Sequence, residues 1–125
     1  MAHPIVIFKE ENVMKIMLVC YGGLSTSILV NNMKKAIEAS EKFRDKGIEI
    51  EAWGKEEYVN QLEGTACVLL GPQVSMIQED VKRVVSEKGY NIPVEVINKE
   101  DYGMMAAVPI LIEAFKAIKA NRQAS

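Results

Sequence analysis

Cys20 begins a stretch in which a thiol, two adjacent glycines and three consecutive hydroxyl side chains follow one another closely. Gly22 and Gly23 can adopt backbone conformations that turn N–H groups toward a common point, which makes a nest for an anion. The hydroxyls at 25–27 can cap a helix, and the N-terminus of that helix adds roughly half a positive charge. A thiol placed there is expected to exist partly as the thiolate.

A thiolate beside an anion-binding loop is suited to covalent phosphoryl transfer. The loop could hold the tetrahedral oxyanion that forms while the thiolate takes up a phosphoryl group. The pattern therefore predicts a phosphocysteine intermediate at Cys20. The expected phosphate-binding loop consists of Tyr21, Gly22, Gly23, Leu24, Ser25, Thr26 and Ser27.

Two other interpretations of Cys20 compete with this one. A cysteine at the end of an apolar strand is commonly a packed small hydrophobe, but burying a cysteine needs no Gly-Gly turn followed by three hydroxyls. Cysteine phosphatases of small parallel-sheet folds use a similar loop, with an arginine that clamps phosphate and a carboxylic acid, for which Asp101 could be proposed. The segment 21–27 contains neither Arg nor Lys. Weaker binding of phosphate by a loop without a cation favours a site that receives phosphate from one protein and passes it to another.

The elements around Cys20 follow from the period of the apolar pattern. Residues 16–20 and 66–70 are continuous apolar runs, as in strands that are covered on both faces. Residues 48–53 alternate and residues 93–97 begin with proline, so these strands belong at the edges of a sheet. Helices are expected at about 26–44, 55–62, 74–88 and 109–121. This succession predicts an α/β fold with a four-stranded parallel sheet of order 2-1-3-4 and helices on both faces.

The chain reverses direction across such a sheet between strands 1 and 3, and ligands bind at the carboxyl ends of those strands. Cys20 ends the first strand and Gly71-Pro72-Gln73 follows the third, so both are expected at this crevice. Gln73 and Tyr102 are candidates for supporting the loop, and a purely structural role is an equal alternative for each. Along the strand direction, Cys67 is expected to lie about 10 Å from the level of Cys20. It is expected in the core, beyond disulfide reach of Cys20.

The sequence as a whole limits the kinds of partner. It has 125 residues and a net charge of -2, which argues against nucleic acid as the main partner, because phosphate neutralisation needs a basic stripe. Two cysteines and one histidine favour neither a disulfide framework nor a zinc site. No apolar run approaches the ~20 residues that span a bilayer and no signal peptide is evident, so a cytoplasmic protein is expected. Residues 14–125 are predicted to form one domain, and the order of the extension 1–13 stays open.

Three ordered motifs resemble those of a known family. The segment Cys20-Tyr-Gly-Gly-Leu-Ser-Thr-Ser-Ile-Leu29 resembles the phosphorylation loop of enzyme IIB of the bacterial phosphoenolpyruvate:sugar phosphotransferase system (PTS), lactose/cellobiose family. Tyr21 and Leu24 replace the serine and methionine of the family's pattern, Cys-Ser-x-Gly-Met-Ser-Thr-Ser-x-Leu. Residues 68–73 and 93–103 resemble the turn after its third strand and its last strand with the following loop. The family's sheet order, 2-1-3-4 in a flavodoxin-like three-layer sandwich, agrees with the order that the pattern predicts.

This resemblance implies a phosphoryl relay. Enzyme IIA would donate a phosphoryl group from a phosphohistidine to Cys20, which would pass it to a sugar held by the membrane permease, enzyme IIC. The single histidine, His3, lies outside the matched region, so the donor is expected to be another protein. The relay requires no cofactor, nucleotide or metal, and a monomer that docks transiently at the permease is expected. The sugar is not specified, although cellobiose, chitobiose and lactose are common in the family, and a regulatory module that senses phosphorylation is the alternative.

Overall fold

The computed structural model describes residues 14–21 and 24–124, apart from the side chains of Leu24 and Ser25. The predicted extension 1–13 and the expected loop glycines Gly22 and Gly23 lie outside the described residues. The strands are β1 Met14–Cys20, β2 Ile48–Gly54, β3 Thr65–Leu70 and β4 Val94–Val96. The α-helices are α2 Leu24–Ala39, α3 Gln78–Glu87, α4 Lys99–Gly103 and α5 Ala107–Ala124, and two 3-10 helices are η1 Tyr58–Gln61 and η2 Pro72–Ile77.

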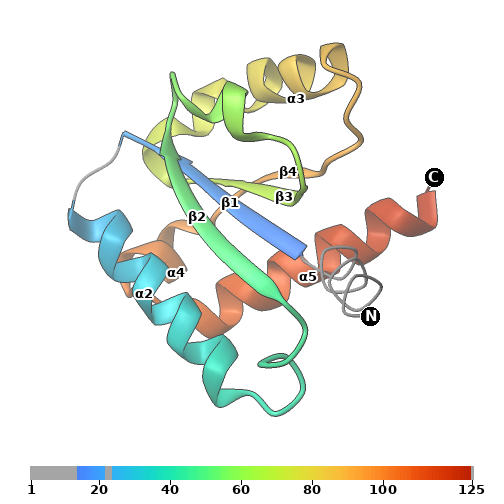
Figure 1. Ribbon diagram of the computed structural model, residues 1–125. Helices are drawn as coiled ribbons and strands as arrows, with labels where there is room; N and C mark the ends of the chain where they lie inside the picture. Colours follow the sequence, from blue (N-terminus) through green and yellow to red (C-terminus); the bar gives the residue numbers. More distant parts are fainter. Residues whose placement is uncertain (1–13, 22–23, 125) are drawn as a thin grey trace.

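The strands form one parallel sheet of order β2-β1-β3-β4, as the pattern predicts. The central strand β1 pairs along its length with β2 and β3, so that Val19 lies between Trp53 and Leu70. Helices α2 and α5 cover one face of the sheet and α3 covers the other (Figure 1). The result is the predicted flavodoxin-like sandwich of three layers.

Alternate residues of the two central strands face two separate hydrophobic clusters, because side chains on a strand point to opposite faces in turn. Ile16 and Leu18 of β1 belong to the cluster under α2 and α5, whereas Met17 and Val19 belong to the cluster under α3. All four are at most 2% exposed. This burial on both faces explains why the strand appears in the sequence as a continuous apolar run.

The first helix ends earlier than the predicted 26–44. Helix α2 ends at Ala39 and turns follow to Gly47. The apolar stripe through Met33 and Ile37 would continue at polar positions, and Phe43 would fall outside it. The chain leaves the helix, and the Phe43 ring stacks on Phe115 of α5 with 4.7 Å between ring centroids.

Two other helix predictions are wrong in type or extent. The segment expected as a helix at 55–62 is a turn followed by the short η1. The helix expected at 74–88 begins instead as η2, and regular α-helix starts only at Gln78. Val74 explains the break, because its backbone is non-helical (φ -117, ψ 22) while its side chain is fully buried under the sheet.

Helix α4 is an element that the apolar period does not predict. Asn98 caps it, since its side-chain oxygen accepts hydrogen bonds from the backbone N–H groups of Glu100 (2.9 Å) and Asp101 (3.0 Å). Tyr102 therefore lies on a capped helix rather than in the loop suggested by the resemblance, and it is only 7% exposed. The last helix, predicted at 109–121, extends further in both directions, with Pro109 in its first turn.

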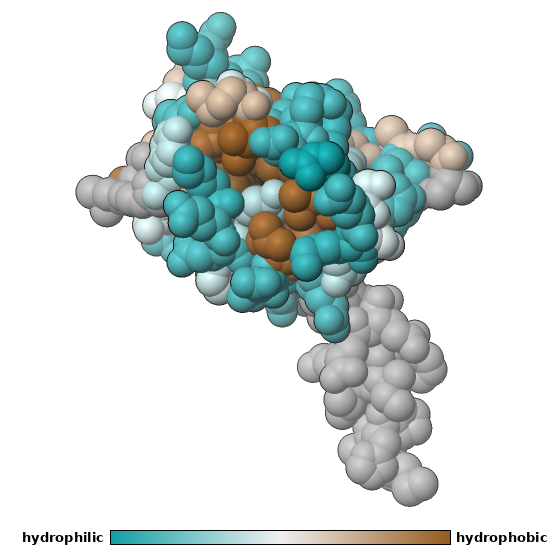
Figure 2. All heavy atoms as spheres, turned by 90° about the horizontal axis from the view of Figure 1, so that it is seen from above, coloured by the Kyte–Doolittle hydropathy of each residue, from teal (hydrophilic) through white to brown (hydrophobic). Residues whose placement is uncertain are grey.

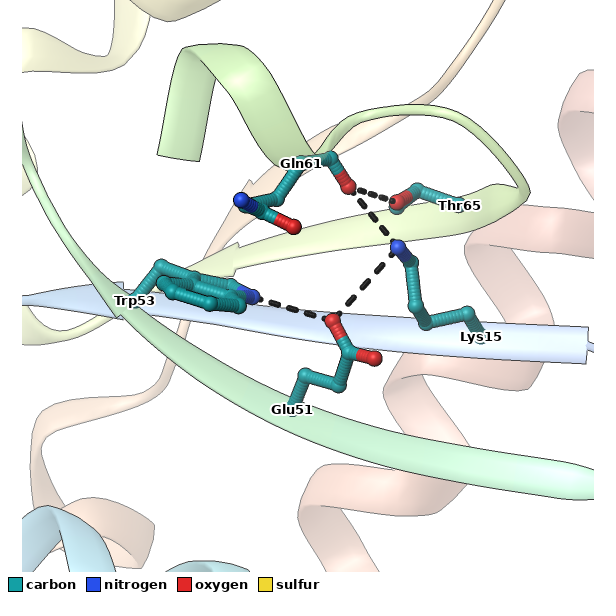
Figure 3. A network of polar contacts seen from close by, with 5 residues as sticks. All are labelled: Lys15, Glu51, Trp53, Gln61 and Thr65. Carbon is teal, nitrogen blue, oxygen red and sulfur yellow. Dashed lines mark hydrogen bonds and ion pairs between the residues drawn. The ribbon is translucent and has the colours of Figure 1, made fainter. Parts of the chain in front are cut away.

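A polar network ties the amino-terminal half of the sheet to the segment after β2 (Figure 3). The Lys15 ammonium donates to the backbone oxygen of Gln61 (2.8 Å) and lies 3.5 Å from the Glu51 carboxylate. The Trp53 indole N–H donates to the same carboxylate (2.9 Å), and the Thr65 hydroxyl contacts the Gln61 oxygen (3.5 Å). Through this network Trp53 has a structural role.

The outer face of α3 is polar. Arg83 lies 3.3 Å from Asp80 and 3.5 Å from Glu87, and Lys82 lies 3.6 Å from Glu79. Seen from this side, the surface is mostly hydrophilic, with hydrophobic atoms gathered near its centre (Figure 2). Among the described residues, no helix is both long and apolar enough to cross a membrane.

Candidate active site

Cys20 lies at the carboxyl end of β1, in the middle of the sheet's edge. It pairs with Gly54, the last residue of β2, and on the other side the Gly71 N–H donates to the Val19 carbonyl (3.0 Å). The strands on both sides thus end beside the thiol, at the point where the sheet order predicts a ligand site. Cys20 is only 4% exposed, yet it belongs to neither hydrophobic cluster of the described residues.

The thiol of Cys20 has a polar partner on the helix that follows. Its sulfur lies 3.0 Å from the hydroxyl oxygen of Thr26, which is 4% exposed in the first turn of α2. The Thr26 oxygen in turn lies 3.5 Å from the phenol oxygen of Tyr102. The sulfur therefore lies at the positive end of a helix of 16 residues, beside a hydroxyl that can donate to a thiolate.

Gly71 brings two more predicted residues to this place. A methyl group built on Gly71 would lie 3.0 Å from the Gln73 side-chain oxygen, 3.7 Å from the Cys20 Cβ and 3.8 Å from a ring carbon of Tyr102. The exposed Gln73 side chain therefore folds back over the glycine that adjoins Cys20. Gln73, from the turn after β3, and Tyr102, from α4, thus both lie at the edge where the thiol lies.

The remaining predicted residues are placed differently. Tyr21 is 62% exposed, and Ser27 is also exposed on α2. Asp101, the carboxylic acid that a phosphatase would need, lines a pocket at the β4 edge together with Glu95 and Glu113. The side chains of Leu24 and Ser25 lie outside the described residues.

Lys55 is a cation near the site that the sequence pattern did not point to. Its ammonium lies 5.4 Å from the centre of the Tyr21 ring, within the range of a cation–π contact. The signal was present, because Lys55 directly follows β2, and the carboxyl ends of neighbouring parallel strands meet at one edge. Lys55 therefore places a cation beside Tyr21, the residue that follows Cys20.

Cys67 confirms the prediction of a core cysteine and provides a contrast with Cys20. It is 0% exposed within the cluster under α2 and α5. Burial, with a smaller contribution from the Glu95 carboxylate, raises the pKa of the Cys67 thiol to about 12. This thiol stays protonated at neutral pH, so Cys67 is unsuited to nucleophilic chemistry.

A thiol at the carboxyl edge of a parallel sheet, beside a helix N-terminus and a hydroxyl donor, is an arrangement that suits cysteine-dependent group transfer. Residues 15–113 match the family model described as "PTS system, Lactose/Cellobiose specific IIB subunit". The chain belongs to this family and is therefore a sugar phosphotransferase component.

Two proteins named as EIIB components are similar in sequence to this chain, in agreement with its family. The chain is 38% identical over 104 residues to the galactose-specific EIIB component of Lactococcus lactis, covering 79% of this chain and 91% of that protein. It is 36% identical over 92 residues to the oligo-beta-mannoside-specific EIIB component of Bacillus subtilis, covering 72% and 82%.

Two solved structures show the same fold. The cellobiose-specific phosphotransferase IIB component of Borrelia burgdorferi is 31% identical, with a TM-score of 0.67 over 87% of this chain and 94% of that one. The lactose-specific IIB domain of Streptococcus pneumoniae is 15% identical, with a TM-score of 0.62 over 82% and 98%. At that lower identity the second likeness concerns the fold alone.

Proposed function

We propose that Cys20 accepts a phosphoryl group from a phosphohistidine of an enzyme IIA and passes it to a sugar bound by a permease, enzyme IIC. The observation that carries the proposal is the position of the Cys20 sulfur, 3.0 Å from the Thr26 hydroxyl at the start of α2. The positive end of the helix favours the thiolate before transfer and the phosphate dianion after it.

The relay consists of two in-line displacements. In the first, the Cys20 thiolate forms an S–P bond while the N–P bond of the phosphohistidine breaks and its electron pair stays on the imidazole nitrogen. In the second, a sugar hydroxyl forms an O–P bond while the S–P pair returns to sulfur, and the hydroxyl proton leaves to a base or to water. Both steps depend on positioning and charge stabilisation, which the described geometry can supply.

The low exposure of Cys20 sets a condition on this proposal. Cys20 as a residue is only 4% exposed, so the phosphohistidine must gain better access to the thiol when the donor docks. Segments of this chain that follow the strands offer a surface for such docking. Tyr21, Met76 and Met104 are 62%, 71% and 78% exposed and follow β1, β3 and β4, whose carboxyl ends share one edge. We call these three residues the apolar rim.

The two methionines after α4 are placed differently. Met104 is exposed, whereas Met105 packs against the core. A flexible, apolar methionine suits a surface that must bind two partners in turn, enzyme IIA and then the permease. Such a relay places the protein in the cytoplasm, transiently at the permease.

The sugar is proposed by class only. The relatives are named for galactose, oligo-beta-mannoside and cellobiose, so a β-linked disaccharide or a related sugar such as lactose is the proposed cargo. Purified enzyme IIC with candidate sugars would decide among these.

Incubation with a phosphohistidyl IIA donor tests the relay. The expected result is a mass gain of one phosphoryl group that maps to Cys20, is lost in Cys20→Ala and is kept in the matched control Cys67→Ala. Absence of that gain in the wild-type protein would overturn the proposal. Release of the group only after permease and sugar are added distinguishes the relay from a regulatory module, and hydrolysis of an aryl phosphate by the isolated protein would indicate a phosphatase.

A further inference from the structure

Three polar groups from separate parts of the chain form a line at the site. The Cys20 sulfur lies 3.0 Å from the Thr26 hydroxyl oxygen, and that oxygen lies 3.5 Å from the Tyr102 phenol oxygen. The three residues are 4%, 4% and 7% exposed. The second distance is long for a hydrogen bond between hydroxyls, so the two groups adjoin each other and need only a small shift to bond tightly.

The ionisation of sulfur decides the direction of these contacts. A thiolate can only accept, so the Thr26 O–H must donate to it, and the lone pairs of the Thr26 oxygen are then left to accept. The Thr26 hydroxyl hydrogen can also rotate away from sulfur, because a hydroxyl turns freely about its C–O bond. A phenol O–H donating to Thr26 from the other side favours the rotamer in which the Thr26 hydrogen points at sulfur.

The Tyr102 phenol is held at this position by its backbone and by its contacts. Asn98 caps α4, and the Tyr102 N–H donates to the Asn98 carbonyl (2.9 Å). A ring carbon of Tyr102 and the Cys20 Cβ both lie within 4 Å of the point where Gly71 would carry a methyl group. The ring and the cysteine are thus packed against the same glycine.

We propose that Tyr102 is a positioning residue for phosphoryl transfer, acting through the Thr26 hydroxyl to hold a hydrogen-bond donor on the Cys20 thiolate. This inference rests on the proposed relay. As the S–P bond forms, the charge moves from sulfur to the phosphoryl oxygens and the Thr26 donor is released from sulfur. As the S–P bond breaks toward the sugar, the electron pair returns to sulfur and the donor stabilises it again, so the line acts on both displacements.

The test measures the ionisation of Cys20 without any PTS partner. Iodoacetamide alkylation is followed across pH, and Cys20 is distinguished from Cys67 by mass mapping of peptides. Tyr102→Phe is expected to move the midpoint of the pH profile upward and to slow alkylation near neutral pH by about fivefold, because a donor to a charged group is weakened. Thr26→Val is expected to slow it more, and Thr26→Ser to preserve the wild-type profile.

A double variant separates positioning from packing. If Tyr102 acts through Thr26, adding Tyr102→Phe to Thr26→Val slows alkylation no further. Tyr90→Phe, which removes a phenol from the α3 side of the sheet, is the matched control and should leave the profile unchanged. An unshifted midpoint in Tyr102→Phe, or effects that simply add in the double variant, would overturn the inference.

The same variants, supplied with a phosphohistidyl IIA donor, give a second readout. Tyr102→Phe is expected to slow phosphorylation of Cys20 near neutral pH by a similar factor and to recover at higher pH, where the thiolate forms without help. If the wild-type protein takes no phosphoryl group, the proposed relay fails, whereas the alkylation profiles still decide whether Tyr102 controls the thiolate.

Discussion

The two cysteines carry the same thiol in different surroundings. Cys67 points into the cluster under α2 and α5 and is fully buried, whereas Cys20 ends its strand beside Thr26. Burial in apolar surroundings penalises the charged thiolate, which raises the pKa of Cys67 to about 12. At Cys20 the Thr26 hydroxyl is a polar partner that can donate to the thiolate.

The raised pKa of Cys67 predicts a loss of stability in alkaline solution. An unfolded Cys67 loses its proton near its ordinary pKa of 9.0, whereas the folded one keeps it until about 12. The stability gained by keeping the buried Cys67 thiol protonated is fully present below pH 9. As pH rises from 9 to about 12, the free energy of unfolding falls by up to about 1.4 kcal/mol per pH unit. Urea unfolding from pH 7 to 10.5 should show a shallower decline for Cys67→Ala.

An alanine substitution at the exposed Ser86 is the matched control for this measurement and should decline in parallel with the wild-type protein. Cys67→Ala will be less stable at pH 7, because it removes buried volume, so the slopes and not the absolute values carry the prediction. Parallel curves for wild-type and Cys67→Ala would contradict it.

At the residue scale, the sequence indicated Cys20 but not how its neighbours are arranged. The chemistry of Cys20 follows from a local pattern, since its glycines and hydroxyls are adjacent in the chain. The contact between Thr26 and Tyr102 joins residues 76 positions apart, and Lys55 reaches Tyr21 only because β2 lies beside β1. Contacts of this kind depend on the fold and leave no local pattern.

At the scale of elements, the strands were predictable and the helix ends were not. Burial on both faces leaves a continuous apolar run in β1 and β3. In the edge strand β2 burial alternates only from Ile48 to Glu51, since Ala52 is exposed and Trp53 packs against the cluster under α3. Helix ends depended on single tertiary contacts, such as the Phe43–Phe115 stack. Helix α4 has five residues, too few to show a helical period, and only its capping residue, Asn98, marks it in the sequence.

The Asn98 cap predicts a link between the stability of α4 and transfer at Cys20. Asn98→Ala removes the acceptor for two backbone N–H groups and should lower the free energy of unfolding by about 1 kcal/mol. Because α4 carries Tyr102, phosphorylation by a IIA donor should slow as well. Asn98→Asp keeps a capping oxygen and should preserve both urea stability and rate, whereas an Asn98→Ala protein with wild-type values of both would contradict the link.

At the scale of the whole molecule, the sheet separates a stable core from an edge that does the chemistry. Both hydrophobic clusters lie on the faces of the sheet, while the carboxyl ends of β1, β3 and β4 lead to Cys20, Gly71 and Asn98. The residues of the apolar rim follow the same three ends. We therefore expect a partner that docks on this edge to contact the rim as it approaches the thiol.

This arrangement predicts that the apolar rim controls the affinity for enzyme IIA without affecting the thiol. Met104→Glu places a charge on a side chain that is 78% exposed, so the fold should be unaffected. Loss of an apolar contact with the donor should raise the KM for the phosphohistidyl donor by about tenfold with little change in kcat. The readout is the rate of Cys20 phosphorylation against donor concentration, with the alkylation profile of Cys20 measured in parallel. Ile112→Glu is the matched control, because Ile112 is 47% exposed on α5 and lies outside the rim; an equal rise in KM for both variants would show that docking depends on overall charge and not on this edge.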